Sequence, residues 1–551
     1  MRDGTTLCTN VFRPAGHTGP ALLIRTPYGK GAQLSPNYRY FVDQGYAVVI
    51  QDVRGRHHSQ GEFGAIEQET ADGEDTLRWI ARQAWSNGRI GMLGGSYLGI
   101  VQWRAALSGS PYLKAIFPVV AGYDEYFDRF YSRGGALKLG HRLVWLAENF
   151  RKPGARPDYH RFVLHLPLRT ADSLATGRRI GFFQEALDHP LYDDYWRRRS
   201  TRERLDRVDV PVFVVGGWYD NFVQSDLEAF AELRKRSAEH RVVVGPWAHN
   251  MSYRFPEADF GPDSAAPVRD FQIEWFDKWV RGTGLSGGHT PSKPVRLFVM
   301  GADRWREDET WPPPGFAPRR LYLSSGGRAN SLEGDGILSW KPPRAEPPDR
   351  FVYDPRHPVP TTGGAICCNP RVFAWGPVDQ RVVEGRPDVL VYTSEPLRED
   401  LEVIGPIRAV LYVATSAPDT DFTAKLVDVF PDGRARILTD GILRLRYRES
   451  LEREAAAVPG EVYPITIDAG VTANVFLAGH RIRLEVSSSN FPRFDRNPNT
   501  GGPIASETAM RTATQTVFHE NGRASHLLLP VKVPEPPRGR RQSRKKLTRR
   551  P

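Results

Sequence analysis

The sequence predicts an α/β protein whose parallel sheet is interrupted by a helical insertion and is followed by a β sandwich. Three observations predict this order. Short β-branched apolar runs alternate with helical periodicity over residues 1–122, the strand signal disappears over residues 123–207, and alternating strands dominate from residue 290 onward. A chain of 551 residues is also too long for one hydrophobic core, so about three domains are expected.

The first part, residues 1–122, alternates strands and helices. Buried parallel strands are expected at "ALLIRTPYG" and "YAVVIQDVRG", because both are β-branched apolar runs closed by turn residues. Helices are expected at "SPNYRYFVDQG" and at "ETADGEDTLRWIARQAW", where Thr76, Leu77 and Ile80 recur at helical spacing. A strand at "GRIGMLGGS", a helix at "YLGIVQWRAALSG" and a strand at "LKAIFPVVAG" complete this part.

The remaining parts differ in composition. Residues 123–207 crowd aromatic and basic side chains together without strand patterning, which predicts a helical insertion, and residues 208–289 return to strands at "VDVPVFVVGGWYDNF" and "HRVVVGPWAHN". Residues 290–535 are Pro-rich with strands such as "VRLFVMG", "RRLYLSS", "RAVLYVATS" and "RIRLEVSSS", which predicts a β sandwich. Residues 536–551 form a basic tail that is expected to be disordered.

Charge and apolar content narrow the class of protein. The formal net charge is +11, and eight positive charges belong to the tail "RGRRQSRKKLTRRP", which leaves three for the rest of the chain. A nearly balanced body indicates a globular enzyme or binding protein, so we expect no nucleic-acid partner beyond what the tail could bind. We expect no membrane partner, because the apolar runs fall short of the ~20 residues that cross a bilayer. The start lacks a secretion signal, which predicts a cytoplasmic protein.

The cysteines indicate neither a disulfide framework nor a metal site. Only Cys8 and the adjacent Cys367 and Cys368 occur, without the spacing that either use requires. We expect them to be reduced and structural. No metal or organic cofactor is implied.

The stretch "GMLGGSYLGI", residues 91–100, carries glycines around Ser96 where a strand should give way to a helix. A tight strand-to-helix turn could expose the serine hydroxyl as a nucleophile, with glycines where a Cβ would collide with backbone. The match to G-x-S-x-G is incomplete, because Leu98 holds the second glycine position and Gly99 comes one residue late. A plain glycine-rich turn is the alternative.

A nucleophilic serine needs a base and a carboxylate that orients it. Asp220 ends the strand "VFVVGGWYD" and His249 ends "VVVGPWAH", in the order Ser, Asp, His that α/β hydrolase sheets use. Taken singly, Asp220 could be a helix N-cap and His249 a surface turn residue. Their joint appearance at strand ends after Ser96 favours a catalytic triad.

The oxyanion of an acyl intermediate needs hydrogen-bond donors. One is normally the backbone N–H of the residue after the nucleophile, which is Tyr97. "RTPYGK" follows the first buried strand, so the Tyr28 phenol could supply a second donor, or it could simply pack.

The motifs "RTPYGK", "DVRGRHHSQGEF", "WIARQAWSNGRIGMLGGSYLG", "GGWYDNF" and "GPWAHN" together resemble the X-prolyl dipeptidyl-peptidase and cocaine-esterase family of serine hydrolases, and the likeness covers nearly the whole chain. The resemblance implies an α/β-hydrolase core, a helical cap inserted before the acid-bearing strand, and a C-terminal β jelly roll of galactose-binding-like type. It also implies Ser96 as nucleophile, Asp220 and His249 as its partners, and Tyr28 with Tyr97 as the oxyanion hole.

The substrate class is indicated by "DNFVQS" after the acid. Relatives that accept α-amino acyl esters have carboxylates there, whereas Phe222 and its neighbours offer no charge and resemble the aromatic acyl pocket of the cocaine-esterase branch. We expect Phe222 and Trp218 to contact the substrate. Asp124, Glu125 and Asp128 could instead recognise an ammonium, but "YDEYFDRF" is better interpreted as an exposed helix face.

We therefore expect a serine hydrolase that cleaves small-molecule acyl esters, or less readily amides, through an acyl-enzyme. One alternative is an enzyme of the same family that removes X-Pro dipeptides or acts on α-amino-acyl esters or β-lactam side chains. Another is a binding protein on a degenerate hydrolase scaffold. A homo-oligomer is compatible with the sequence.

Overall fold

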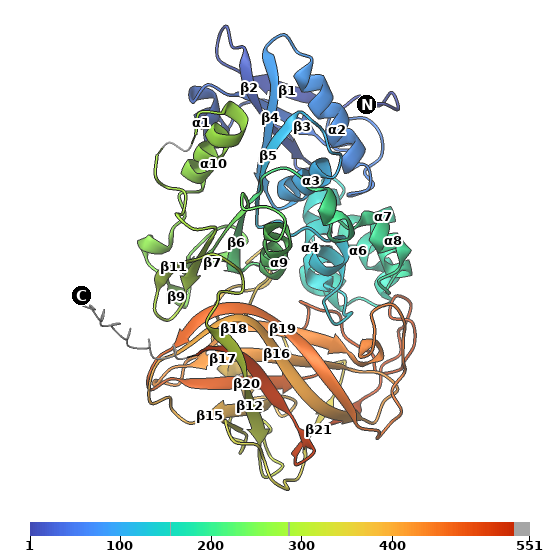
Figure 1. Ribbon diagram of the computed structural model, residues 1–551. Coiled ribbons are helices and arrows are strands. Elements are labelled where there is room, and N and C mark those ends of the chain that lie inside the picture. The colour runs from blue at the N-terminus through green and yellow to red at the C-terminus, as the bar shows by residue number, and fades with distance from the viewer. Residues whose placement is uncertain (155, 285–286, 534–551) are drawn as a thin grey trace, which may run out of the picture.

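A nine-stranded, mostly parallel sheet forms the N-terminal layer of the computed structural model, which describes residues 1–154, 156–284 and 287–533 (Figure 1). The strands lie in the order β1-β3-β2-β4-β5-β6-β7-β10-β11, and only the edge pairs β1/β3 and β10/β11 are antiparallel. The bounds are β1 Thr9–Phe12, β2 Gly19–Thr26, β3 Ala47–Asp52, β4 Ser86–Gly95, β5 Leu113–Val119, β6 Phe213–Tyr219, β7 Arg241–Ala248, β10 Val295–Val299 and β11 Arg304–Asp308.

Helices cover both faces of this sheet, which is why its strands are apolar on both sides. Leu22 of β2 shares one apolar cluster with Phe41 of α1 and Trp275 of α10, whereas the next residue, Leu23, shares another with Leu77 of α2. Successive residues of one strand thus belong to different cores. The helices are α1 Pro36–Asp43, α2 Glu69–Ala81, α3 Tyr97–Ala106, α9 Val223–Arg234 and α10 Val268–Phe276, which runs on into a π-helical turn, Asp277–Arg281.

The cap is a set of short helices inserted between β5 and β6, where the sequence predicts a helical insertion. Its aromatic side chains form its core: the ring of Tyr126 lies 4.8 Å from that of Tyr131 and 5.3 Å from that of Trp196. None of the helices in the described ranges is long and apolar enough to cross a membrane. The cap helices are α4 Leu139–Phe150, α5 Tyr159–Leu164, α6 Ala171–Thr176, α7 Gly181–Asp188 and α8 Asp194–Arg199, with shorter turns at Tyr126–Phe130, Leu168–Thr170 and Arg202–Arg207.

The C-terminal jelly roll is a strongly curved, mostly antiparallel sheet that lies across one end of the α/β layer and the cap (Figure 1). Its longest strands, β16 and β19, pair along almost their full length, and β19 contacts β6 and β10. The strands are β12 Phe316–Ser324, β13 Ile337–Ser339, β14 Asp349–Tyr353, β15 Leu390–Ser394, β16 Leu401–Thr415, β17 Asp421–Val429, β18 Ala435–Arg444, β19 Tyr463–Phe476, β20 Arg481–Ser487, β21 Ala513–Glu520, β22 Arg523–Ala524 and β23 His526–Lys532, and the short helix α11 spans Arg381–Glu384.

The fold class expected from the sequence is confirmed, but one strand was assigned to the wrong sheet. The run "VRLFVMG" was placed in the sandwich that starts at residue 290; it forms β10, which pairs in parallel with β7 through Val295 and Val242. The α/β sheet therefore continues to Asp308, because a short apolar strand has the same pattern at a sheet edge and in a sandwich. The predicted tail, 536–551, lies outside the described residues.

A buried ion-pair network joins the jelly roll to the cap. Arg444 pairs with Asp421 at 2.9 Å and with Asp495 at 3.0 Å, and Asp495 also accepts the backbone N–H of Leu137 in the cap at 2.8 Å. The Arg444 N–H donates to the carbonyl of Gly134. Since unpaired buried charges are costly, this network fixes the position of the cap loop that leads into α4.

Candidate active site

Ser96 sits in a strained turn between β4 and α3. Its backbone has φ 56° and ψ −127°, a region that residues with a Cβ rarely adopt. The turn is held at both ends, because the Ser96 N–H donates to the Val119 carbonyl at 2.9 Å and the Ser96 carbonyl accepts the Gly99 N–H at 2.8 Å. The side chain is partly exposed at the carboxyl edge of the sheet.

The glycines around Ser96 make this turn sterically feasible. A Cβ on Gly94, which has φ 135°, would lie 2.5 Å from the Cβ of Leu98. A Cβ on Gly99 would lie 2.5 Å from the Cβ of Ala121. Leu98 can therefore occupy the position that is usually glycine, because the space it needs is the space that Gly94 leaves empty. The departure from G-x-S-x-G is compatible with a nucleophile turn.

Asp220 and His249 lie next to each other because they follow neighbouring parallel strands. Asp220 comes one residue after β6 and His249 one residue after β7, and Tyr219 pairs with Ala248. His249 Nδ1 is 2.5 Å from Asp220 Oδ2. With Nδ1 bonded to a carboxylate, Nε2 is left to accept a proton. Within the described chain Ser96 Oγ makes no hydrogen bond to His249, and such bonds are often loose before substrate binds.

The carboxylate of Asp220 is shielded from water. It is fully buried, and its Oδ1 accepts the N–H of Phe222 at 3.0 Å, whereas the His249 side chain is 15% exposed. Asp226, in the first turn of α9, accepts the Gly122 N–H at 3.0 Å. Burial, and then the charge of Asp220, raise the pKa of Asp226 well above its usual value. The neutral form of Asp226 avoids a second negative charge beside Asp220.

Tyr28 and Tyr97 supply free donors at the same sheet edge. The backbone N–H of Tyr97 begins α3 and donates to no protein acceptor in the described ranges. Trp145 Nε1 donates to Tyr28 Oη at 3.2 Å, which leaves the phenol proton available. The Tyr28 loop is held from behind by Arg56, whose Nε donates to the Pro27 carbonyl at 2.9 Å. Trp145 was missed in the sequence, where it is one of many aromatic residues of the insertion.

The two predicted substrate contacts lie in different places. The ring of Phe222 is 5.7 Å from that of His249 and 6.0 Å from that of His141. Trp218 is buried, and its Nε1 donates to the carbonyl of Phe298 on β10 at 2.7 Å. Phe222 therefore lies against the His249 ring, whereas the indole N–H of Trp218 joins β6 to β10, two strands away in the sheet.

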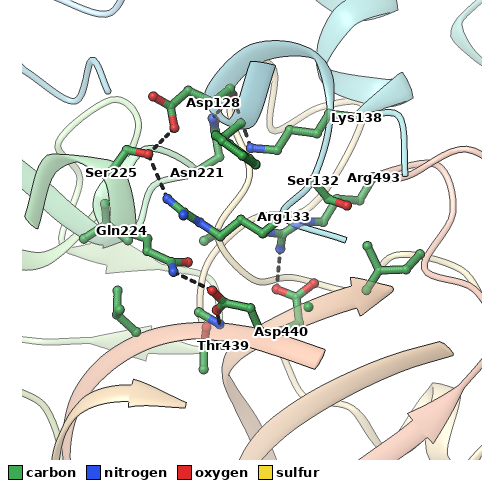
Figure 2. Close-up of a pocket in the computed structure, with 18 of the residues that line it drawn as sticks. Asp128, Ser132, Arg133, Lys138, Asn221, Gln224, Ser225, Thr439, Asp440 and Arg493 are labelled. Carbon is green, nitrogen blue, oxygen red and sulfur yellow. Dashed lines mark hydrogen bonds and ion pairs between the residues drawn. The ribbon is translucent and has the colours of Figure 1, made fainter. Parts of the chain in front are cut away.

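A small polar cavity of about 70 Å³, lined in part by Asp220, lies between α9, the cap and the jelly roll (Figure 2). Several of its polar side chains are hydrogen-bonded within the protein: Arg133 donates to Ser225 and Glu228, Arg493 to Asp440, and Gln224 to Asp468. A polar space of this size can hold a few water molecules.

The carboxylates at the start of the cap are buried, which corrects the expected exposed helix face. Asp124, Glu125 and Asp128 are 3%, 5% and 3% exposed. Asp128 accepts the N–H groups of Tyr123 and Asp124 and the hydroxyl of Ser225. The acidic residues in this segment are typical of a surface helix, but each carboxylate is hydrogen-bonded or ion-paired to nearby groups.

Their partners are local. Glu125 pairs with Arg129 one turn along at 3.0 Å, and Asp124 accepts the N–H of Phe127 and the hydroxyl of Ser200. Burial, with the nearby charge of Asp128, raises the pKa of Asp124 to about 6.

The expectation of reduced cysteines is also corrected. Cys367 and Cys368 form a disulfide, and Cys8 is free. The sulfur atoms of the pair and a ring nitrogen of His141 lie within 4.8 Å of one another, a proximity that sequence spacing could not predict because His141 belongs to the cap.

The sequence matches family profiles and a known relative over most of its length. Residues 3–251 match the profile of the X-Pro dipeptidyl-peptidase (S15 family), and residues 288–528 match the X-Pro dipeptidyl-peptidase C-terminal non-catalytic domain. The cocaine esterase of Rhodococcus sp. (strain MB1 Bresler) is 42% identical over 563 residues, covering 96% of this chain and 97% of that protein.

Two solved structures are similar over nearly their whole length. An aminopeptidase from the marine sediment archaeon Thaumarchaeota archaeon has a TM-score of 0.84, and an α-amino acid ester hydrolase has one of 0.83. Each is 26% identical and covers 96% of this chain, with 95% of the other chain matched.

Replacing Asp124 with Asn should change how stability depends on pH. The folded pKa near 6 exceeds the ordinary value, so the carboxyl contributes stability that is present at low pH and lost as pH rises from about 4 through 6. Asp124→Asn removes this titration. In thermal unfolding, the free energy of unfolding of the variant relative to the parent protein should rise between pH 4 and pH 7, by up to about 3 kcal/mol.

The exposed Asp206 of the cap is the matched control, because Asp206→Asn should keep a constant offset across the same pH range. An equally constant offset for Asp124→Asn would show that folding does not raise the pKa of Asp124.

Proposed function

Because the chain belongs to the X-Pro dipeptidyl-peptidase (S15) family of serine hydrolases, we propose that it cleaves small, uncharged acyl esters through an acyl-enzyme on Ser96. The observation that carries the proposal is the 2.5 Å contact between Asp220 and His249 at the sheet edge where the turn exposes Ser96. A pair of this geometry serves a serine that reacts at a carbonyl carbon.

The proposed reaction uses each of these groups once. Ser96 Oγ attacks the ester carbonyl while His249 Nε2 takes the hydroxyl proton, and Asp220 stabilises the resulting imidazolium. The carbonyl oxygen becomes an oxyanion that receives hydrogen bonds from the Tyr97 N–H and the Tyr28 O–H. His249 then gives its proton to the departing alcohol. Water, activated by the same imidazole, releases the acid and restores Ser96.

Preference for an uncharged acyl group is supported by the apolar Phe222 ring beside His249 and by the pairing of the cap carboxylates. Phe222 lies against His249, and the cap carboxylates are committed to their own networks. A buried ammonium without a partner is costly. An aromatic or short aliphatic acyl group needs no such partner.

The competing candidate is hydrolysis of substrates with a free α-amino group. Its support comes from the family profile and from the similarity to an aminopeptidase and an α-amino acid ester hydrolase. It requires that Asp124, Glu125 or Asp128 leave their present partners to receive the ammonium.

Acyl selectivity tests the proposal directly. Benzoyl and acetyl esters of one alcohol should be turned over with higher kcat/KM than matched esters with an α-ammonium group. Phe222→Ala should lower kcat/KM for the benzoyl ester by roughly 1–3 kcal/mol of transition-state binding, the scale of apolar pocket contacts. The acetyl ester, which does not reach the ring, is the internal control. A requirement for a free amine, lost on N-acetylation of the substrate, would favour the competing candidate.

Tyr28→Phe should slow acylation on the order of 10²-fold, the cost of one oxyanion donor, with little change in KM. Trp145→Phe removes the indole donor that orients the phenol and should produce a smaller loss. Because both changes act on one hydrogen bond, the double variant should be no slower than Tyr28→Phe alone. Pre-steady-state acylation rates measure this, and strictly additive losses would separate Trp145 from Tyr28.

A further inference from the structure

One face of α4 contacts residues of the proposed active site. His141 and Trp145 are one helical turn apart, so their side chains lie on the same side of the helix. Trp145 donates to Tyr28 Oη, and the ring of His141 lies 6.0 Å from that of Phe222, which in turn lies against His249. A group that moves His141 would therefore act on the acyl side of the site.

The disulfide of Cys367 and Cys368 is such a group. It belongs to a loop of the jelly-roll region that a bridge between Gly364 and Gly376 closes. The loop is tied to α4, because Asn369 Nδ2 donates to Glu148 Oε1 at 2.6 Å. Cys367 is 2% exposed and Cys368 is partly exposed, so a small reagent can reach one sulfur of the pair.

His141 is a buried donor next to these sulfurs. Burial, and then the charge of Arg142, hold the pKa of His141 well below its ordinary value, so the ring is neutral. An Arg142 guanidinium nitrogen lies 2.9 Å from His141 Nε2 and can only donate, which places the single ring proton on Nδ1. Nδ1 has no partner among the described residues.

This protonation argues against a metal at the three-residue cluster. A metal-binding histidine gives one nitrogen lone pair to the metal and directs its other N–H to an acceptor. At His141, Nε2 faces a guanidinium, which offers no acceptor. The ring therefore cannot bind a metal through Nδ1 and donate an N–H from Nε2 at the same time. An N–H backed by a positive charge instead stabilises a thiolate, which is the form of cysteine that attacks disulfides.

We propose that Cys367 and Cys368 form a reversible thiol–disulfide site that adjusts acyl selectivity. In the reduced protein, the thiolate of one cysteine attacks a low-molecular-weight disulfide, RSSR, and releases one RS⁻. The second cysteine thiolate attacks the protein sulfur of the mixed disulfide and releases the other RS⁻. The two protein S–H protons go to the released thiols. Two electrons thus pass from the cysteines to RSSR, and a dithiol reductant reverses the change.

The effect on selectivity follows from the packing. Cleaving the S–S bond lets the two sulfurs move apart from bonded to non-bonded separation. The two cysteine side chains then occupy more space next to His141. His141 packs on Phe222, so the space available to a large acyl group is reduced. Reduction should therefore lower kcat/KM for a benzoyl ester about tenfold, the lower end for an apolar pocket contact, and leave the acetyl ester nearly unchanged. This readout rests on the proposed esterase function.

The experiment treats the full-length protein with either dithiothreitol or oxidised glutathione, removes the reagent, and measures two quantities. Alkylation in denaturant followed by mass spectrometry counts free thiols; three are expected after reduction and one, Cys8, after oxidation. The benzoyl-to-acetyl ratio of kcat/KM should be about tenfold higher in the oxidised sample. Cys8→Ser should retain the response, and the double variant Cys367→Ser/Cys368→Ser should lose it. The single variant Cys367→Ser serves if the double variant fails to fold.

Three free thiols after oxidised glutathione, or a selectivity ratio that does not change when the thiol count does, would overturn the proposal. Failure of the esterase assignment is distinguishable. In that case both esters are inert in both samples and the claim on selectivity falls, while the thiol count still decides whether the pair is reversible.

Discussion

The strained turn at Ser96 is the constraint on which the rest of the site depends. A residue with a Cβ holds φ 56° there only because its two backbone hydrogen bonds are fixed and because Gly94 and Gly99 leave room for Leu98 and Ala121. The same turn starts α3 at Tyr97, so one backbone conformation both exposes the hydroxyl and frees an N–H beside it. The strain is offset by the packing of the surrounding sheet and helices.

The sheet supplies the other groups at known positions relative to that turn. Parallel strands end at one edge, so Tyr28 after β2, Asp220 after β6 and His249 after β7 lie at the same edge as Ser96 after β4, without any one long loop having to place them. The cap and the jelly roll contribute further contacts that support these groups. Trp145 of the cap orients Tyr28, and the buried Arg444 network holds the cap against the jelly roll. Precision at the site thus depends on contacts between parts that are far apart in sequence.

Sequence patterns were sufficient for features that depend on local order. Strand periodicity and the order Ser96, Asp220, His249 predicted the fold class and the contact between the acid and the base. Patterns failed where the answer depends on long-range packing. The strand at Val295 was assigned to the sandwich because its own sequence does not indicate that it pairs with β7. The buried carboxylates at Asp124 and Asp128 have the polar pattern of a surface helix, and nothing in the spacing of the cysteines indicates that His141 lies beside them.

The proposed reaction requires that Ser96, Tyr28 and Tyr97 together bind a tetrahedral acyl intermediate. The most direct measurement is the structure of the protein inactivated by a small aryl phosphonate ester. Phosphorus bonded to Ser96 Oγ, with the phosphoryl oxygen about 2.7–3.1 Å from both Tyr97 N and Tyr28 Oη, is the predicted result. A phosphonate on another serine, or a phosphoryl oxygen directed away from both donors, would rule out this oxyanion hole.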